Sequence, residues 1–205
     1  MSDPHAVAKD DLHRYLEAAR EALLWKLEGV SEYDARRPVV RSGTNLLGLV
    51  KHVAGIEAEY LGGCFDNPFP DPLPGWSPEA GPNSDMWATA DESLEDIVAL
   101  YQRVWEHCDE TIDVLGLGSP GQIPWWPADR AAVTLHQILV HLIAETHRHA
   151  GHADILREII DGSIGLRPGN SNLPDVDDQW WVDYVERLES TAREVGRRDA
   201  VTGEA

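Results

Sequence analysis

Apolar residues recur at helical spacing in five separate segments of the chain. Leucine, isoleucine, valine and aromatic residues return every three or four positions in each segment, as they do on one face of an α-helix. Strand-like alternation of useful length does not occur. The pattern predicts helices over residues 10–27, 44–63, 91–115, 134–161 and 176–195, with Thr44 as the N-cap of the second. We therefore expect an all-α fold, a four-helix bundle supported by an extra C-terminal helix.

The connections between these helices differ greatly in length. Residues 64–90 are dense in proline, glycine, aspartate and asparagine, which predicts a long irregular segment. We expect this segment to cross the end of the bundle, to join two parallel helices and to cover a pocket. A second connection contains Pro124-Trp-Trp-Pro127, which predicts a rigid aromatic turn. Residues 9–195 are expected to form a single domain between flexible tails at 1–8 and 196–205.

The charge of the chain excludes some classes of partner. Its formal net charge of −19 repels phosphate groups, so we expect neither nucleic acid nor anionic lipid as a partner. No run of about 18 apolar residues occurs, so no membrane span is expected. The first residues lack the basic-then-apolar pattern of a signal peptide, which favours the cytoplasm. Cys64 and Cys108 are too few for a disulfide framework, and we expect both to be buried or half-buried thiols.

The predicted helix over 134–161 carries ionisable groups inside its apolar face. At about 100° per residue, His149 falls in the middle of the apolar stripe and Glu145 on its edge. The two residues are four positions apart, so they lie one turn apart and close enough to hold one ion. Burying them without partners would be costly. The pattern indicates a metal site, and a hydrogen-bonded polar cluster without metal is the alternative.

A metal site also needs a ligand from a facing helix, and His52 is the candidate. It lies on the flank of the apolar stripe in the second predicted helix. With Glu145 and His149 it would give a His₂-carboxylate set, which leaves a position for water or substrate, as in catalytic sites. Zinc suits these ligands, and iron and nickel are alternatives. His141 and His152 lie on the same side of their helix as alternate ligands or as partners of the ligands.

Two motifs contain these candidates. The first is Asn45-Leu-Leu-Gly-Leu-Val-Lys-His52-Val-Ala-Gly, and the second is Glu145-Thr-His-Arg-His149-Ala-Gly-His152-Ala-Asp-Ile-Leu-Arg-Glu158. They resemble the DinB-like superfamily of metal-binding four-helix-bundle proteins, and most closely its actinobacterial "mini-circle protein" branch. The resemblance covers residues 10–195 and implies an up-down-down-up bundle in which His52, Glu145 and His149 bind a divalent metal. The mycothiol-dependent maleylpyruvate isomerase, a related member, is similar in its His-Glu-His set.

The resemblance also implies a function. Characterised members of the superfamily use the metal to activate a low-molecular-weight thiol such as mycothiol or bacillithiol, because a metal-bound thiol loses its proton near neutral pH. We expect an enzyme of thiol-transferase type, in which a mycothiol-like thiol attacks an electrophilic small molecule. Cys64 lies about three helical turns beyond His52, and Cys108 lies on the core face of another helix. The nucleophile is therefore expected to come from outside the chain.

Two other functions fit the same residues. The chain could be a non-enzymatic metal or small-ligand binding protein in stress response or detoxification, or a structural bundle with a vestigial site. An open coordination position beside a pocket would favour the enzyme. We expect residues 64–90 and the Trp125-Trp126 pair to shape the substrate entrance, and we expect a homodimer. Ion pairs at the end of the bundle are expected from Asp154, Arg157 and Glu158.

Overall fold

The computed structural model describes residues 4–77 and 79–202, and most of them are helical. The α-helices of this part are α1 (Pro4–Trp25), α2 (Glu32–Arg36), α3 (Leu46–Glu57), α4 (Leu94–Val114), α5 (Leu135–Asp161) and α6 (Asp178–Thr202). Shorter elements are the π-helical turn η1 (Ala58–Gly62), the 3-10 turns η2 (Gly63–Phe65) and η3 (Ser84–Met86), and the strands β1 (Pro120–Gln122) and β2 (Ala132–Thr134).

Short polar residues and glycine set the ends of the helices that matter most for function. The Asn45 side chain accepts a hydrogen bond from the Gly48 amide and starts α3, and Thr134 caps α5 in the same way. Gly162, at φ 77°, ends α5 in the left-handed conformation that glycine adopts at low cost. The predicted N-cap Thr44 is wrong by one residue, because the neighbouring Asn45 provides the capping oxygen.

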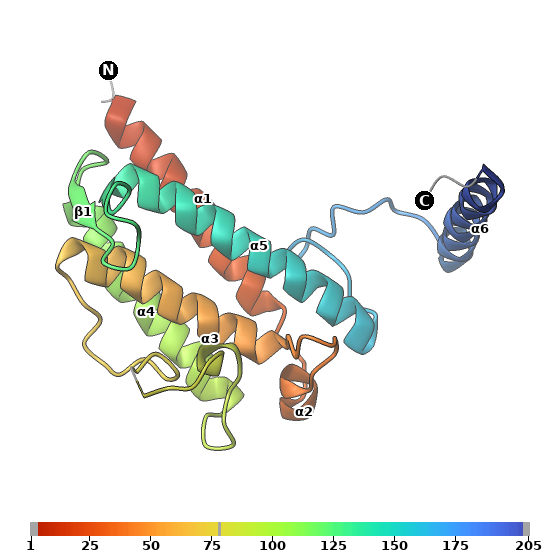
Figure 1. Cartoon of the computed structure of the whole chain (residues 1–205), viewed down its shortest axis with the longest axis horizontal. Helices are drawn as coiled ribbons and strands as arrows, with labels where there is room; N and C mark the ends of the chain where they lie inside the picture. Colours follow the sequence, from red (N-terminus) through yellow and green to blue (C-terminus); the bar gives the residue numbers. More distant parts are fainter. Residues whose placement is uncertain (1–3, 78, 203–205) are drawn as a thin grey trace. The chain divides into compact units, whose positions relative to one another are not determined.

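The bundle is formed by helices α1, α3, α4 and α5 (Figure 1). Helices α1 and α5 run in the same direction, since Lys26, just after α1, pairs with Asp154 late in α5 at an N···O distance of 2.6 Å. Helices α1 and α4 run in opposite directions, since Lys9 near the start of α1 donates to the carbonyl of Asp113 at the end of α4. Helix α3 runs parallel to α4 (Figure 1). The predicted all-α bundle with up-down-down-up topology is confirmed.

Aliphatic and aromatic side chains fill the space between these helices. The largest fully buried apolar residues are Leu16, Leu23, Leu46, Leu47, Leu49, Leu61, Ile97, Tyr101, Ile112, Ile123 and Leu135. Removing such surface from water contributes about 25 cal/mol per Å², which makes this shared core the main source of stability. Because all four helices contribute to it, residues projecting inward from α3 and α5 are held in fixed positions.

An ion pair lies inside the core between α1 and α3. Arg20 and Glu57 are 1% and 0% exposed, and the guanidinium donates to both carboxylate oxygens at 2.5 and 3.2 Å. Arg20 also donates to Asp109 of α4 at 2.8 Å. Burial raises the pKa of the Glu57 carboxyl, and the Arg20 guanidinium beside it acts in the opposite direction. The pair ties three helices together, and loss of either partner would leave a buried group without its counterpart.

Two connections contain structure that the hydrophobic pattern does not reveal. Strands β1 and β2 pair antiparallel, and Pro124-Trp-Trp-Pro127 lies between them. Three-residue strands are too short to give a recognisable alternation, so the sequence predicted none. The long 64–90 connection runs against α3, where a Cβ added to Gly48 would sit 1.8 Å from the carbonyl oxygen of Met86. The close approach of that backbone requires glycine at this position.

The chain divides into two compact units, residues 1–171 and 172–205. The bundle belongs to the first unit, and α6 is the described helix of the second. That residues 9–195 form a single domain stays a prediction. Within the described ranges, no helix combines the length and apolar character needed to cross a membrane.

Both ends of the described chain are helical farther out than the pattern predicts. Helix α1 begins at Pro4, within the tail predicted over 1–8, and α6 continues to Thr202, within the tail predicted over 196–205. The outermost three residues at each end lie outside the described part. At the first end the apolar pattern starts later than α1 does, because Val7 is the one large apolar side chain among residues 4–9.

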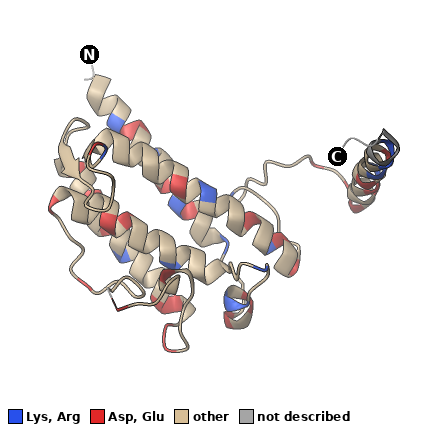
Figure 2. Cartoon of the chain, viewed as in Figure 1, with Lys and Arg blue, Asp and Glu red and all other residues tan. Residues whose placement is uncertain are grey.

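Acidic and basic residues are interspersed over the bundle (Figure 2). Several basic side chains are paired locally with acidic ones, such as Arg36 with Glu32 at 2.7 Å and Arg157 with Asp161 at 2.9 Å. Ion pairs of this kind, in which the acidic partner is exposed to solvent, add little to stability. The excess of acidic residues leaves a negative field that repels phosphate-rich polymers.

Candidate metal centre

The three predicted metal ligands meet between α3 and α5. His52 comes from the middle of α3, and Glu145 and His149 come from the middle of α5. One ligand atom of each residue lies within 4.8 Å of those of the other two. His149 Nε2 lies 3.1 Å from Glu145 Oε1, and the ring centroids of His52 and His149 are 5.0 Å apart. The structure brings these residues together, and their binding of a metal stays a prediction.

The distances within this group are those of a ligand set that can close on one ion. Two atoms that bind a zinc-sized ion at about 2.1 Å with tetrahedral geometry lie about 3.4 Å apart. The separation of His149 Nε2 and Glu145 Oε1 is close to this value. The ligand atom of His52 lies within 4.8 Å of those of Glu145 and His149, so all three ligand atoms are close enough to approach one ion. The donor set therefore fits a divalent metal.

The group is partly open to solvent. The side chains of His52, His149 and Glu145 retain 16%, 10% and 29% of their surface exposed. Burial lowers the pKa of His149, as does the nearby His52, while the hydrogen bond with Glu145 acts in the opposite direction. A lowered pKa favours the neutral imidazole, which is the form that binds metals.

Three buried polar atoms in or next to the group have no hydrogen-bond partner among the described residues. They are Nδ1 of His149 and Oγ1 of Thr146, both on α5, and Nε1 of Trp76, whose ring stacks near His52. An unsatisfied buried polar atom costs about 1–3 kcal/mol. A closed polar cluster, the alternative to a metal site, would be expected to satisfy its own members. The chain does not complete the hydrogen bonding of His149, which favours a site that takes a ligand.

Residues of the long connection surround His52, and the sequence did not single them out. Asp85 of η3 places Oδ2 2.5 Å from Nδ1 of His52, and the Trp76 ring stacks near the same imidazole with centroids 6.2 Å apart. The composition of residues 64–90 predicted a functional segment. It could not identify Asp85 or Trp76, because an irregular segment has no period that fixes where each side chain points.

His141 and His152, the alternate ligand candidates, lie in different surroundings. His141 lies one turn before Glu145, and its ring packs against Tyr60 of η1, with centroids 4.8 Å apart. The hydroxyl oxygen of Tyr60 accepts from the indole nitrogens of Trp126 and Trp125 at 3.0 and 3.4 Å. We call Tyr60, Trp125, Trp126 and His141 the aromatic cluster. His152 is exposed, with its ring centroid 5.4 Å from that of His149. Neither histidine belongs to the three-residue group.

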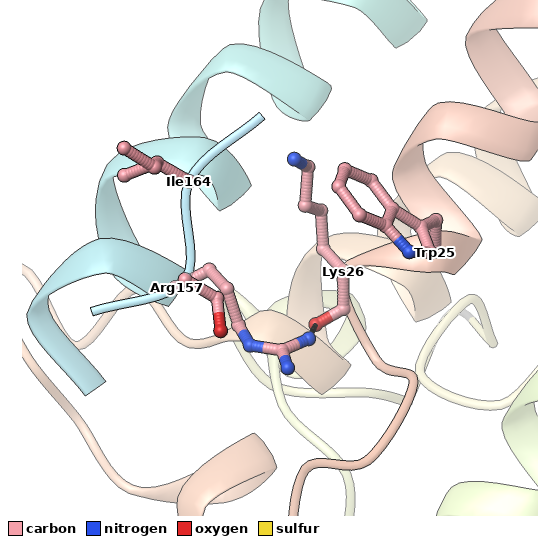
Figure 3. Close-up of a pocket in the computed structure, with 5 residues that line it drawn as sticks. Trp25, Lys26, Arg157 and Ile164 are labelled. Atoms are coloured by element: carbon pink, nitrogen blue, oxygen red, sulfur yellow. Dashed lines mark hydrogen bonds between the residues drawn. The ribbon is translucent and has the colours of Figure 1, made fainter. Parts of the chain in front are cut away.

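A separate small cavity of about 70 Å³ lies between the ends of α1 and α5 (Figure 3). Its cations are paired within the protein. Lys26 donates to the carbonyl of Gly165 at 2.5 Å and pairs with Asp154, and Arg157 donates to the carbonyl of Lys26 and pairs with Asp161. These contacts confirm the expected end-of-bundle ion pairs of Asp154 and Arg157. They fix the segment after α5. Lys26 and Arg157 are both occupied by these contacts, so neither is free to act on a ligand in the cavity.

Comparison with known proteins adds an independent observation. The sequence model of the mycothiol-S-transferase family matches residues 11–162, which include all three predicted ligands and all of the bundle except the start of α1. The chain belongs to this family. The mycothiol S-transferase family is a member of the DinB-like superfamily, so the resemblance seen in the two motifs is confirmed.

One solved structure is similar to the chain over most of its length. It is described as a conserved protein of locus from Enterococcus faecalis, is 15% identical, covers 80% of this chain and 100% of its own, and superposes with a TM-score of 0.51. At that identity the likeness shows the fold alone. No curated protein matches the chain.

Proposed function

We propose that this member of the mycothiol S-transferase family is a divalent-metal-dependent enzyme that transfers mycothiol to an electrophilic small molecule. Membership of the family supports the thiol and the transfer. The meeting of His52, Glu145 and His149 within 4.8 Å is the observation that supports the metal dependence. Zinc is the proposed metal, with nickel and iron as alternatives, since all three accept imidazole ligands.

The chemistry follows from the ligand set. His52, Glu145 and His149 would hold the metal, and three protein ligands would leave at least one position for the substrate thiol. A bound divalent metal would supply thiolate near neutral pH by lowering the pKa of that thiol. The sulfur of the thiol would then form a bond to the electrophilic carbon. In a substitution the leaving group departs with its electron pair, and in an addition a proton from solvent completes the product.

The aromatic cluster is the proposed surface for the electrophile. His141 lies one turn from Glu145 on α5, so the cluster begins next to the ligand set. Trp126 and Trp125 are fixed by their hydrogen bonds to the Tyr60 hydroxyl, and Trp125 is 50% exposed. A rigid, partly exposed aromatic surface can bury the apolar part of a small molecule at low entropic cost. This arrangement supports the predicted role of the tryptophan pair at the substrate entrance.

The cysteines of the chain do not compete with an external thiol. Burial raises the pKa of Cys64 to about 11, and the nearby Glu59 adds to this shift. Burial also raises the pKa of Cys108 well above its ordinary value, and its Sγ donates to the carbonyl of Glu57. A protonated, buried thiol is a poor nucleophile. The nucleophile is therefore proposed to be the thiol of mycothiol.

A conjugation assay tests the proposal. Metal-loaded protein is mixed with mycothiol and a haloalkyl bimane, which becomes fluorescent when sulfur displaces its halide. We expect acceleration over the reaction without protein, loss of acceleration in His149→Ala, and retention in His147→Ala, an exposed position on the same helix. Cysteine and glutathione in place of mycothiol report the preference for the thiol. Wild-type protein that holds metal but accelerates no conjugation would contradict the proposal.

A non-enzymatic role is the second candidate. In that case the same residues would bind a metal or small ligand in stress response or detoxification. The partial exposure of all three ligands favours the enzyme, because an enclosed site would leave no room for a substrate. The conjugation assay separates the two, since the binding protein would take up metal without turnover.

A cytoplasmic location and a homodimeric assembly are also proposed. Cys64 and Cys108 are both free, as in a reducing compartment, which supports the cytoplasm. A homodimer is proposed because apolar side chains such as Ile155 and Ile159 of α5 are more than half exposed. Light scattering on the full chain measures the second point, and a monomer at micromolar concentration would contradict it.

A further inference from the structure

The closest polar contact of the candidate metal centre reaches it from outside the two ligand helices. Asp85 lies in η3, within the long connection between α3 and α4. Its Oδ2 is 2.5 Å from Nδ1 of His52, and the two side chains are 23% and 16% exposed. In a partly desolvated place, a hydrogen bond to a carboxylate is stronger than one between neutral groups.

Packing against α3 fixes the position of Asp85. Gly48, His52 and Gly55 are four and three residues apart, so they lie along one side of the helix. A Cβ on Gly48 would sit 1.8 Å from the Met86 carbonyl oxygen, and a Cβ on Gly55 would sit 2.0 Å from Nε1 of Trp76. The connection therefore touches α3 one turn on either side of His52.

Further hydrogen bonds fasten the segment that carries Asp85. The Asn45 side chain, which caps α3, donates to the Met86 carbonyl at 3.3 Å. Lys51, next to His52 in the chain, donates to the Trp87 carbonyl and to both oxygens of Glu92, each at 2.9 Å. The residues just after Asp85 are thus tied to the helix that carries His52.

The contact decides which nitrogen of His52 carries the proton. An ionised carboxylate can only accept hydrogen bonds, so Nδ1 of a neutral His52 must be the N–H that donates to Asp85. The lone pair is then on Nε2, the nitrogen on the far side of the ring. The Trp76 ring, stacked at an interplanar angle of 24°, covers one face of the imidazole and limits its rotation.

We propose that Asp85 is the positioning residue of the metal centre, which holds His52 as the Nδ1–H tautomer and turns Nε2 toward Glu145 and His149. This inference rests on the proposed metal dependence. Carboxylate partners of metal-binding histidines orient the ring and raise its basicity, and their loss weakens metal affinity by about 10- to 100-fold. The long connection, which supplies both Asp85 and Trp76, thereby becomes part of the metal centre itself.

The first arm of the test needs no metal. Long-range ¹H–¹⁵N spectra of the metal-free protein, recorded at about pH 8.5, where a histidine of ordinary pKa is neutral, report the tautomer of each imidazole. We expect His52 as the Nδ1–H form in the wild type and a mixture of tautomers in Asp85→Ala. Asp85→Asn keeps an accepting oxygen but adds a donating NH₂, so it should hold the Nδ1–H form less completely than the wild type does.

The second arm measures zinc affinity by competition with a chromophoric chelator. We expect Asp85→Ala to bind about 10- to 100-fold more weakly than the wild type, with a smaller loss in Asp85→Asn. Asp91→Asn, an exposed carboxylate just before α4, is the matched control and should bind like the wild type. Circular dichroism of each variant shows that the bundle is intact.

The outcomes separate this inference from the proposed function. An Nε2–H tautomer of His52 in the wild type, or equal zinc affinity of Asp85→Ala and wild type, would overturn the role of Asp85. A wild-type protein that binds no zinc would sink the proposed metal dependence. The tautomer in the metal-free protein would still decide whether Asp85 positions His52.

Discussion

His52 and His149 face each other edge to face across the α3–α5 interface, with ring centroids 5.0 Å apart and planes at 73°. Burial lowers the pKa of His149, and the neighbouring His52 acts in the same direction. The interface thus places two imidazoles, with His149 favoured in its neutral form, next to the Glu145 side chain. Such a group is suited to a cation.

Replacing Cys64 with serine should leave mycothiol conjugation unchanged. Its thiol is buried and its pKa is raised to about 11, so almost none of it is thiolate at neutral pH. The rate of bimane conjugation by metal-loaded Cys64→Ser, compared with the wild type, is the measurement. A variant that binds metal normally but has lost conjugation would show that the chain supplies its own nucleophile.

Replacing Gly48 with alanine should loosen the long connection and weaken the metal centre. The new Cβ would meet the Met86 carbonyl oxygen at 1.8 Å, so the backbone next to Asp85 must move. We expect a loss of about 1–3 kcal/mol in the free energy of unfolding, as for other overpacked sites, together with weaker zinc binding. Urea unfolding and chelator competition measure the two effects.

Gly151→Ala is the matched control for this substitution. Gly151 lies within α5, and a Cβ there would meet nothing within 4 Å. Alanine should stabilise the helix by about 0.5–1 kcal/mol, because glycine loses more conformational freedom on folding. Equal stability of Gly48→Ala and wild type would contradict the described packing of the connection on α3.

Some residues of the metal centre could be predicted from the sequence and others could not. Glu145 and His149 could be paired from the sequence because a helix fixes the geometry of residues four apart. His52 was chosen from the resemblance and from its place on the flank of an apolar stripe. Which residues of two helices face each other depends on packing along the whole length of both helices. No local sequence pattern encodes that packing. Asp85 was missed because its position depends on the fit of the connection against Gly48.

In the fold, too, features set by local sequence could be predicted, and features that depend on long-range contacts could not. Each bundle helix was predicted because its apolar spacing and capping residues are local features, and an error such as Thr44 for Asn45 shifts a boundary by one residue. The β1–β2 hairpin and the π-helical turn that presents Tyr60 were not predicted. Both are too short to produce periodicity, and contacts with distant segments stabilise them.

The stability of the bundle should depend on pH through His13. Its Nε2 lies 2.9 Å from Oδ1 of Asp109, and this hydrogen bond raises the pKa of His13 above its ordinary value of 6.5, against the effect of burial. The folded protein therefore binds this proton more tightly than the unfolded chain does. The resulting stabilisation is fully present below pH 6.5 and is lost as the pH rises through the raised folded pKa.

Urea unfolding of wild type and His13→Gln at about pH 5.5 and about pH 8.5 checks this prediction. The wild type should exceed the variant by more at the lower pH. Asp109 does not change this window: burial acts to raise its pKa, but His13 and Arg20 outweigh that effect and lower it. A difference between the two proteins that is the same at both pH values would contradict the role of His13.

The most direct test of the central claim is metal analysis of purified, untagged protein by plasma mass spectrometry. The wild type, Glu145→Ala, His149→Ala and the control His147→Ala are reconstituted with zinc and dialysed side by side. We predict about one equivalent of metal in the wild type and in His147→Ala, as expected for a single His₂-carboxylate site, and loss of that metal in the other two variants. Wild-type protein that retains no zinc, nickel or iron after reconstitution would contradict the metal centre, and His52, Glu145 and His149 would then be a polar cluster of the core.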